Sequence, residues 1–222
     1  MIKRNIVAEL SQGKCADAKS KILKSALEEF SMLPFSAVRT RQIASNAGVN
    51  HAAISYYFGG KKELYLETVR QISEYIHLYI AEFFARASEV KRAKSIEQAK
   101  ALIHDFTMSR VCIDSENNVF FRNIISIIMR EEMYPTEAFD IIYEKVIEPS
   151  VALLVDMLKI ASSGKCKGVE AQILAQMLLG QVMLFNSTKS GFKRISGWKT
   201  FGSKEYSKID YVQSRILQKI FT

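Results

Sequence analysis

Hydrogen-bonding and cationic side chains gather in one short stretch, residues 40–62, which reads TRQIASNAGVNHAAISYYFGGKK. His51, Ser55 and Tyr57 offer hydrogen bonds of the kind that recognise the edges of bases in a DNA groove. The small side chains of Ala52 and Ala53 leave room for a groove floor or a thymine methyl group. The outward residues of the helix expected here are His51, Ala52, Ala53, Ser55, Tyr56 and Tyr57. None of these residue types is specific alone, so the interpretation depends on the elements that hold them.

A pair of lysines closes the stretch, in the first turn of the next expected helix. The helix macrodipole disfavours cations at that end, but a nearby phosphate would reverse the preference. We therefore interpret Lys61 and Lys62 as clamps on a nucleic-acid backbone. The alternative is that they are solvated charges balanced by Glu63 and Glu67.

A helix-turn-helix is the element that would position these side chains. Gly48 supplies the positive φ that a three-residue turn requires, and Ala44 is small where two helices must cross closely. Asn50 is a suitable N-cap for the second helix, because its side-chain oxygen can accept a bond from a free N–H. The apolar residues expected to face inward are Ile43, Ala44, Ala47, Val49, Ile54 and Phe58.

From about Ala16 to Val69 the chain resembles the DNA-binding domain of the tetracycline-repressor (TetR) family of bacterial regulators. The stretches KILKSALEEF, TRQIASNAGVN and AAISYYFGGKKELY carry the resemblance. It implies double-stranded DNA as the partner, with Thr40, Arg41 and Lys61 on phosphates. It places the following residues in the major groove: His51, Ala52, Ala53, Ser55 and Tyr57.

Two positions depart from the family pattern. The family usually has glycine after its first helix, whereas this chain reads Ser31, Met32, Leu33, Pro34, so the turn must be built differently. A tyrosine is also common where Ser55 stands, which puts one expected contact in question.

Helical apolar spacing, together with this resemblance, predicts an all-α protein with an N-terminal helix-turn-helix domain (residues 1–62) and a larger C-terminal helical domain (residues 63–222). The chain has 222 residues, of which 48% are hydrophobic, and only three prolines. We expect no membrane span, since no uninterrupted apolar run reaches roughly 18 residues. We also expect a cytoplasmic location, because no export signal is visible and the three cysteines show no CxxC spacing.

Charge is distributed unevenly along the chain. Residues 1–65 hold ten Lys or Arg against five Asp or Glu, which suits a polyanionic partner. Residues 66–185 hold thirteen against sixteen, and residues 186–222 hold eight against two. This last basic segment is either a solvated surface or an extra contact with DNA or an acidic partner.

Apolar spacing of three and four predicts a long helix from Lys62 toward Ser88. Further helices are expected at residues 95–112, 117–133, 136–162, 168–190 and 203–221. Pro149 should kink or divide its helix, and the stretch SGFKRISGWKTFGSK should form the last break.

The segments MREEMYPTEAF, KVIEPSVALL and GQVMLF are similar to the C-terminal domain of the TetR branch typified by CecR. The resemblance implies a domain that binds a small effector and forms the dimer. The helix at 169–189 fits the dimer role because it is apolar on more than one face. Its expected core stripe is Ile173, Leu174, Met177, Leu178, Val182 and Phe185, with Leu179, Met183 and Leu184 on other faces. Together with residues 203–221 it would complete a four-helix interface between two copies, although a fully buried helix in a monomer would show the same pattern.

The effector pocket is expected among bulky residues of the central helices, namely Phe84, Phe106, Phe121, Met129, Arg130 and Tyr143. The alternative is plain core, which is the usual place of an aromatic residue at helical spacing.

Catalysis is not expected, and neither is a metal or cofactor. Histidines occur only at 51, 77 and 104, and no HExxH, CxxC, GxSxG or glycine-rich phosphate loop appears. The hypothesis is therefore a homodimeric regulator, released from its operator by a small-molecule effector. The alternative is a helical interaction module of the same fold that has lost operator recognition.

Overall fold

The computed structural model describes residues 6–12, 17–111 and 119–221, and within them every regular element is helical. The all-α prediction is therefore confirmed. The chain divides into two compact units: the first unit comprises residues 1–79 and 118–148, and the second comprises residues 80–117 and 149–222. The predicted domain boundary at residue 62 does not coincide with this division, and it stays a prediction.

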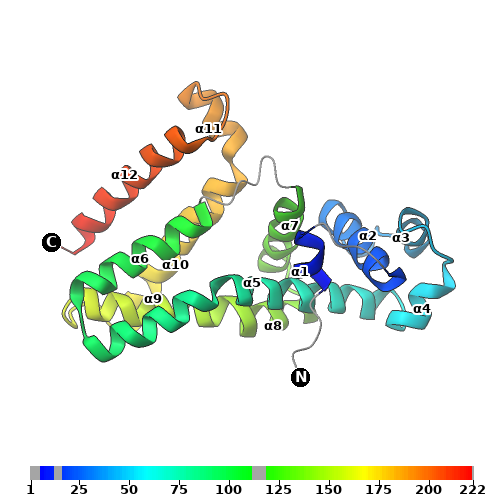
Figure 1. The fold of residues 1–222 in the computed structure, drawn as a ribbon, viewed down its shortest axis with the longest axis horizontal. Helices are drawn as coiled ribbons and strands as arrows, with labels where there is room; N and C mark the ends of the chain where they lie inside the picture. Colours follow the sequence, from blue (N-terminus) through cyan, green and yellow to red (C-terminus); the bar gives the residue numbers. More distant parts are fainter. Residues whose placement is uncertain (1–5, 13–16, 112–118, 222) are drawn as a thin grey trace. The chain divides into compact units, whose positions relative to one another are not determined.

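The first unit contains the expected helix-turn-helix (Figure 1). Its elements are α1 (Ile6–Ser11), α2 (Ala18–Met32), α3 (Thr40–Asn46), α4 (Ala52–Phe58), the start of α5 (Lys61–Ala93), α7 (Val119–Met133), α8 (Glu137–Ile142) and the π-helical turn η1 (Tyr143–Ile147). Helix α2 begins where Asp17 Oδ1 accepts a bond from the Ser20 N–H at 2.8 Å, as an N-cap should. It packs against α1, α3 and α7. Helix α1 was not expected from the sequence.

Helix α5 carries the predicted apolar stripe. Leu66, Val69, Ile72, Ile80 and Phe83 are buried at spacings of three and eight residues. The helix runs to Ala93, five residues beyond the predicted end at Ser88. Its residues up to Tyr79 belong to the first unit and the rest to the second.

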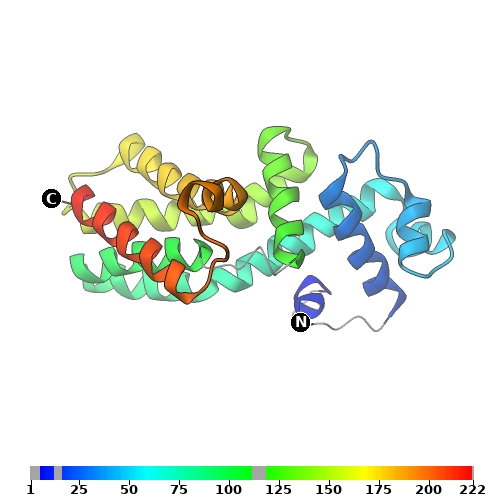
Figure 2. The same cartoon turned by 90° about the horizontal axis from the view of Figure 1, so that it is seen from above.

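The second unit is built from the end of α5 with α6 (Ile96–Val111), α9 (Glu148–Ala161), α10 (Gly168–Ser187), α11 (Lys189–Ser196) and α12 (Ser203–Ile220). Helix α6 contacts both α10 and α12, and Figure 2 shows α12 in red lying across α6 in green. The core of this unit includes Phe83, Leu102, Phe106, Leu154, Met157, Leu158 and Leu178.

The helix predicted at 136–162 is interrupted just before Pro149, as expected. The five residues of η1 separate α8 from α9. Proline has no N–H to donate to the carbonyl four residues earlier, which is that of Lys145. His77 Nδ1 lies 3.2 Å from this oxygen and donates to it in the Nδ1–H tautomer.

The predicted core stripe of α10 is wrong in part. Ile173 and Met177 are 57% and 59% exposed, whereas Ala171, Ala175 and Leu178 form the buried face. Leu179, which was expected on another face, packs against the core. Small alanines take the inner face because α6 lies close to α10 along this side. The larger apolar residues are therefore directed outward.

By length and composition alone, the window Gly168–Phe185 of α10 is apolar enough to cross a membrane. This differs from the expectation of no such segment. Gln176 and Gln181 interrupt the apolar run, but the mean hydropathy of the whole window is still high enough for a membrane span. A single such helix is weak evidence, since core helices of other folds pass the same test.

The stretch expected to form the last break contains helix α11. Its Phe192 packs against Phe185 with ring centroids 5.3 Å apart, and Gly197, with φ +72°, ends the helix. Aromatic packing therefore outweighs the low helical propensity of the glycine and serines in this stretch. Of the three cysteines, Cys15 and Cys112 lie outside the described residues, and Cys166 is a half-buried free thiol.

Candidate nucleic-acid interface

The turn between α3 and α4 has the predicted geometry. Gly48 adopts φ +65°, and the N–H of Val49 donates to the carbonyl of Ala44 at 3.0 Å. Ala44 is buried where the two helices meet. Asn50 Oδ1 accepts a bond from the Ala52 N–H at 2.9 Å, so it caps the first turn of α4 as predicted.

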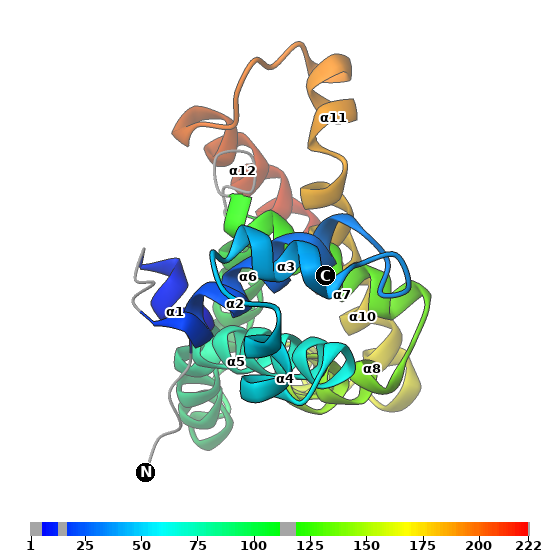
Figure 3. The same ribbon diagram turned by 90° about the vertical axis from the view of Figure 1, so that its right-hand side faces the viewer.

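Helix α4, which is labelled together with α3 in Figure 3, buries one face and exposes the other according to the accessibility of its residues. Ile54 and Phe58 lie inward, four residues apart. The residues expected to meet bases lie mainly outward, since only Ala53 is half-buried and the exposed ones are His51, Ala52, Ser55, Tyr56 and Tyr57. Tyr56 is 82% exposed and its ring stands edge-on to that of Tyr57, with centroids 5.0 Å apart. The arrangement presents aromatic and hydrogen-bonding groups on one surface.

Two predicted contact residues bind each other across the turn. Thr40 Oγ1 lies 2.9 Å from His51 Nε2, which joins the first residue of α3 to the start of α4. This hydrogen bond restricts both side chains before any ligand binds. Arg41, the next residue of α3, is exposed.

The predicted lysine clamps have different surroundings. Lys61 Nζ lies 3.4 Å from the carbonyl of Ser36 and 4.6 Å from the centre of the Phe35 ring, and burial lowers its pKa. Lys62 is exposed and forms an ion pair of 2.8 Å with Glu137 of α8, whose hydrogen bond and charge raise the Lys62 pKa. Neither lysine is an isolated solvated charge.

At the end of α2, where the family pattern usually has glycine, the side chain of Arg130 from α7 caps the helix. Its guanidinium donates to the carbonyls of Phe30, Ser31 and Leu33, the last two at 3.0 and 2.8 Å. Leu33 is extended, with φ −122°, so the left-handed cap that normally satisfies such carbonyls is absent here. A side chain of α7 therefore ends the first helix of the DNA-binding fold.

A second contact joins the beginning of α5 to the link between α7 and α8. The Tyr65 hydroxyl donates to Glu131, whose other carboxylate oxygen accepts bonds from the N–H and Oγ1 of Thr136 at 3.0 and 2.9 Å. Tyr65 and Glu131 are both buried. Burial, followed by the hydrogen bond to Glu131, raises the Tyr65 pKa far above its usual value.

Sequence reasoning missed this support. The charged residues Arg130, Glu131 and Glu137 lie in the segment MREEMYPTEAF, but no local pattern shows that they contact the end of α2 and the start of α5. It also missed a polar chain in which Gln42 donates to Asn46 and Asn46 donates to Glu29, each at 2.8 Å. That chain ties α3 to α2.

The six residues predicted for the effector pocket are divided between the units. Phe84 and Phe106 lie in the second unit, where Phe106 is buried against Phe83. The other four, Phe121, Met129, Arg130 and Tyr143, lie in the first unit. Arg130 caps α2, and Tyr143 is 43% exposed.

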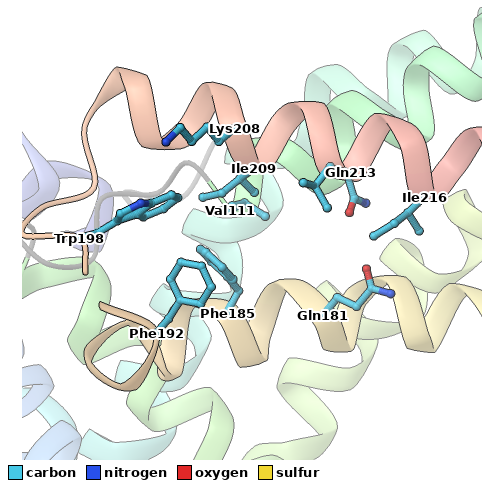
Figure 4. A pocket seen from close by; sticks show the side chains of 10 residues that line it. Val111, Gln181, Phe185, Phe192, Trp198, Lys208, Ile209, Gln213 and Ile216 are labelled. Carbon is cyan, nitrogen blue, oxygen red and sulfur yellow. The ribbon is translucent and has the colours of Figure 1, made fainter. Parts of the chain in front are cut away.

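A cavity of about 380 Å³ lies in the second unit, and none of these six residues lines it (Figure 4). Its walls come from α6, α10 and α12 and from the segment around α11. The lining residues are Val111, Gln181, Phe185, Phe192, Trp198, Lys208, Ile209, Val212, Gln213 and Ile216.

Comparison with known proteins agrees with this architecture. Residues 22–68 match the bacterial regulatory proteins of the tetR family, and residues 100–221 match the C-terminal domain of the HTH-type transcriptional dual regulator CecR. The chain is 28% identical over 195 residues to CecR of Shigella flexneri, covering 85% of this chain and 84% of that protein. It is 33% identical over 129 residues to the probable HTH-type transcriptional regulator YttP of Bacillus subtilis, covering 52% and 59%.

Solved structures share the fold at low sequence identity. The transcriptional regulator FadR from Bacillus subtilis, in complex with stearoyl-CoA, aligns with a TM-score of 0.55 at 16% identity, over 89% of this chain and 96% of that one. A TetR-like regulator from a Rhodococcus species aligns with a TM-score of 0.57 at 14% identity, over 89% and 93%. With its N-terminal helix-turn-helix and its CecR-type C-terminal part, the chain belongs to the TetR family of DNA-binding transcriptional regulators.

Proposed function

We propose that this regulator is a cytoplasmic homodimeric repressor, without catalytic activity, that reads a two-fold operator and leaves it when a small molecule binds. The observation that carries the DNA-binding part is the exposed polar face of α4, mounted on the buried residues Ile54 and Phe58. A helix held in this way can enter a major groove without unfolding any of its supports.

The contacts divide into two kinds. His51, Ser55 and Tyr57 would meet base edges, with Ala52, Ala53 and Tyr56 beside them. Phosphates would bind Thr40, Arg41, Lys61 and Lys62. For Lys62 a phosphate has to take the place of the Glu137 carboxylate, which already lies 2.8 Å from the ammonium.

The homodimer would form through α10 and α12. Four apolar residues on α10, Val169, Ile173, Met177 and Leu184, are each more than half exposed and follow helical spacing. A face of this kind needs a partner, and a second copy of the chain offers an identical face. Two helix-turn-helix domains related by a two-fold axis would then bind half-sites about 34 to 36 Å apart.

The release step follows from population shift. The dimer would exchange between a conformation whose helix-turn-helix domains match the operator spacing and one whose spacing does not match. An effector that binds the second conformation more tightly lowers operator affinity, and the ratio of its affinities for the two conformations limits the size of the effect. The FadR structure in complex with stearoyl-CoA supports the ligand-binding part of this step, because a regulator of the same fold binds a non-protein ligand.

Footprinting on the DNA upstream of the gene for this protein tests the proposal. We expect protection of two half-sites, lost in His51→Ala and kept in Lys159→Ala, an exposed position on α9. Absence of sequence-specific protection at low salt would instead favour a helical interaction module that no longer recognises an operator.

A further inference from the structure

The cavity in the second unit has the size of a small-molecule site. Its volume of about 380 Å³ falls within the range of roughly 300 to 1,000 Å³ that is usual for ligand pockets. Side chains of α6, α10 and α12 face it, and α11 with its following loop contributes Phe192 and Trp198 at one end (Figure 4).

One end of the cavity is a cluster of aromatic rings. Phe192 lies 5.3 Å from Phe185 and 5.2 Å from Trp198, measured between ring centroids. Phe201 is buried, and its ring centroid lies 5.5 Å from that of Trp198. Rings fixed by edge-to-face packing present rigid apolar surface, on which a flat ligand binds with little loss of side-chain entropy.

A positive charge lies at this aromatic end. The Lys208 ammonium is 5.8 Å from the centre of the Trp198 ring, and Figure 4 shows Lys208 close to that ring. Residues 186–222 hold eight Lys or Arg against two Asp or Glu, so the surrounding segment is basic as well. An anionic group is therefore favoured beside the rings.

The opposite end carries two neutral polar side chains beside the apolar Ile216. Gln181 and Gln213 both line it, and Gln213 Nε2 donates to Thr107 Oγ1 at 3.3 Å. The four residues that we assign to the dimer face of α10 do not line the cavity, whereas Val212 and Ile216 of α12, the other helix of the proposed interface, do line it. Two glutamines and a lysine suit a small polar-ended ligand better than the apolar core of a dimer.

We propose that this cavity binds an aromatic organic anion, with its flat body against Phe192 and Trp198 and its carboxylate or sulfonate beside Lys208. The assignment deepens the proposed function, since this ligand class would be the effector. It also gives a role to the basic C-terminal segment, which DNA binding by the helix-turn-helix leaves unexplained.

The single tryptophan of the chain makes the site directly observable, because Trp198 lines it. The full-length protein is titrated with 8-anilinonaphthalene-1-sulfonate and, separately, with N-phenyl-1-naphthylamine, which has the same rings without the sulfonate. We expect tryptophan-sensitised emission from both probes, with tighter and more salt-dependent binding of the sulfonate.

Variants of the cavity then separate the contribution of the Lys208 charge to probe binding from that of the aromatic surface. Lys208→Gln should weaken binding of the sulfonate about two- to fivefold and leave the neutral amine unchanged, since an exposed ion pair contributes little more than this. Lys219→Gln, an exposed lysine of the same helix outside the cavity, should change neither. Phe192→Leu should weaken both probes while keeping most of the apolar volume.

Three results would overturn the proposal. One is probe binding without energy transfer from Trp198, and another is equal loss in Lys208→Gln and Lys219→Gln. The third is binding of the probes to the monomer but not to the dimer, with the two forms distinguished by sedimentation alongside the titration. In that case a second copy of the chain, rather than a ligand, would fill the cavity. Footprinting distinguishes failure of this site from failure of the proposed function. If a probe binds in the cavity but leaves the operator footprint intact, the ligand site stands and its role as the effector site is refuted.

Discussion

The hydrogen bond between Tyr65 and Glu131 should couple the start of α5 to the link between α7 and α8. Tyr65→Phe removes the hydroxyl and keeps the ring, whereas Glu131→Gln keeps the shape of the side chain and removes its charge. A double-mutant cycle on these two changes isolates their interaction from the other contacts of each residue.

The magnitude follows from burial. Tyr65 is 5% exposed and Glu131 is 2% exposed, so solvent screens their bond very little. A hydrogen bond to a charged group contributes about 1.5 to 3 kcal/mol, and we expect a coupling energy near the lower end, about 1.5 kcal/mol. It is not larger because Thr136 still donates twice to the carboxylate when the hydroxyl is removed.

Hydrogen exchange followed by mass spectrometry is the suitable assay, with peptides from α2 and α7. Fluorescence of Trp198 does not report on this region, since that residue belongs to the second unit. Each single variant should raise exchange about tenfold or more if these helices open together. Tyr56→Phe is the matched control, because its side chain is 82% exposed. A coupling energy below about 0.5 kcal/mol, within ordinary additivity, would refute the reasoning.

Four further predictions follow from the same structure. Arg130→Met should destabilise the first unit by about 1.5 to 3 kcal/mol, because two carbonyls of α2 and that of its C-cap residue Leu33 lose a charged donor, and Arg130→Lys should recover only part of this in urea unfolding. Above pH of about 10 the unfolded chain ionises Tyr65 before the folded chain does, so stability should fall with rising pH, and Tyr65→Phe should flatten that fall; equal slopes would contradict the pKa direction. Lys61→Ala should lower the slope of log affinity against log salt by about 0.9 for every DNA sequence, and Glu137→Gln should tighten binding by freeing Lys62; gel shifts over a salt series test both. Ile173→Glu should turn the dimer into monomer in sedimentation without lowering the melting temperature, since the side chain is 57% exposed; a persistent dimer would place the interface elsewhere.

Local sequence rules were sufficient to predict the position and geometry of the helix-turn-helix. Gly48, Ala44 and Asn50 each act within a few residues of their own position, through a positive φ, a close crossing and an N-cap. Spacing of apolar residues also located α5, because a buried stripe on a long helix leaves a periodic pattern.

Contacts between distant segments could not be predicted in the same way. Arg130 binds carbonyls about a hundred positions earlier, and a charged residue near a proline gives no sign of such a partner. The inner face of α10 was misassigned because apolar content alone does not show which face lies inward, and there the closeness of α6 favours Ala171 and Ala175. Helix α11 was missed because ring packing around Phe192, rather than propensity, stabilises it.

The arginine cap on α2 also bears on how this protein is made. Arg130 leaves the ribosome nearly seventy residues after position 62, which at roughly 5 to 20 residues per second is a delay of about 3 to 14 s. During that interval the nascent N-terminal segment has neither its helix cap nor the acceptor for Tyr65. We therefore expect an unfinished chain to bind DNA poorly, and an excised fragment of residues 1–62 should be a poorer binder than the whole protein.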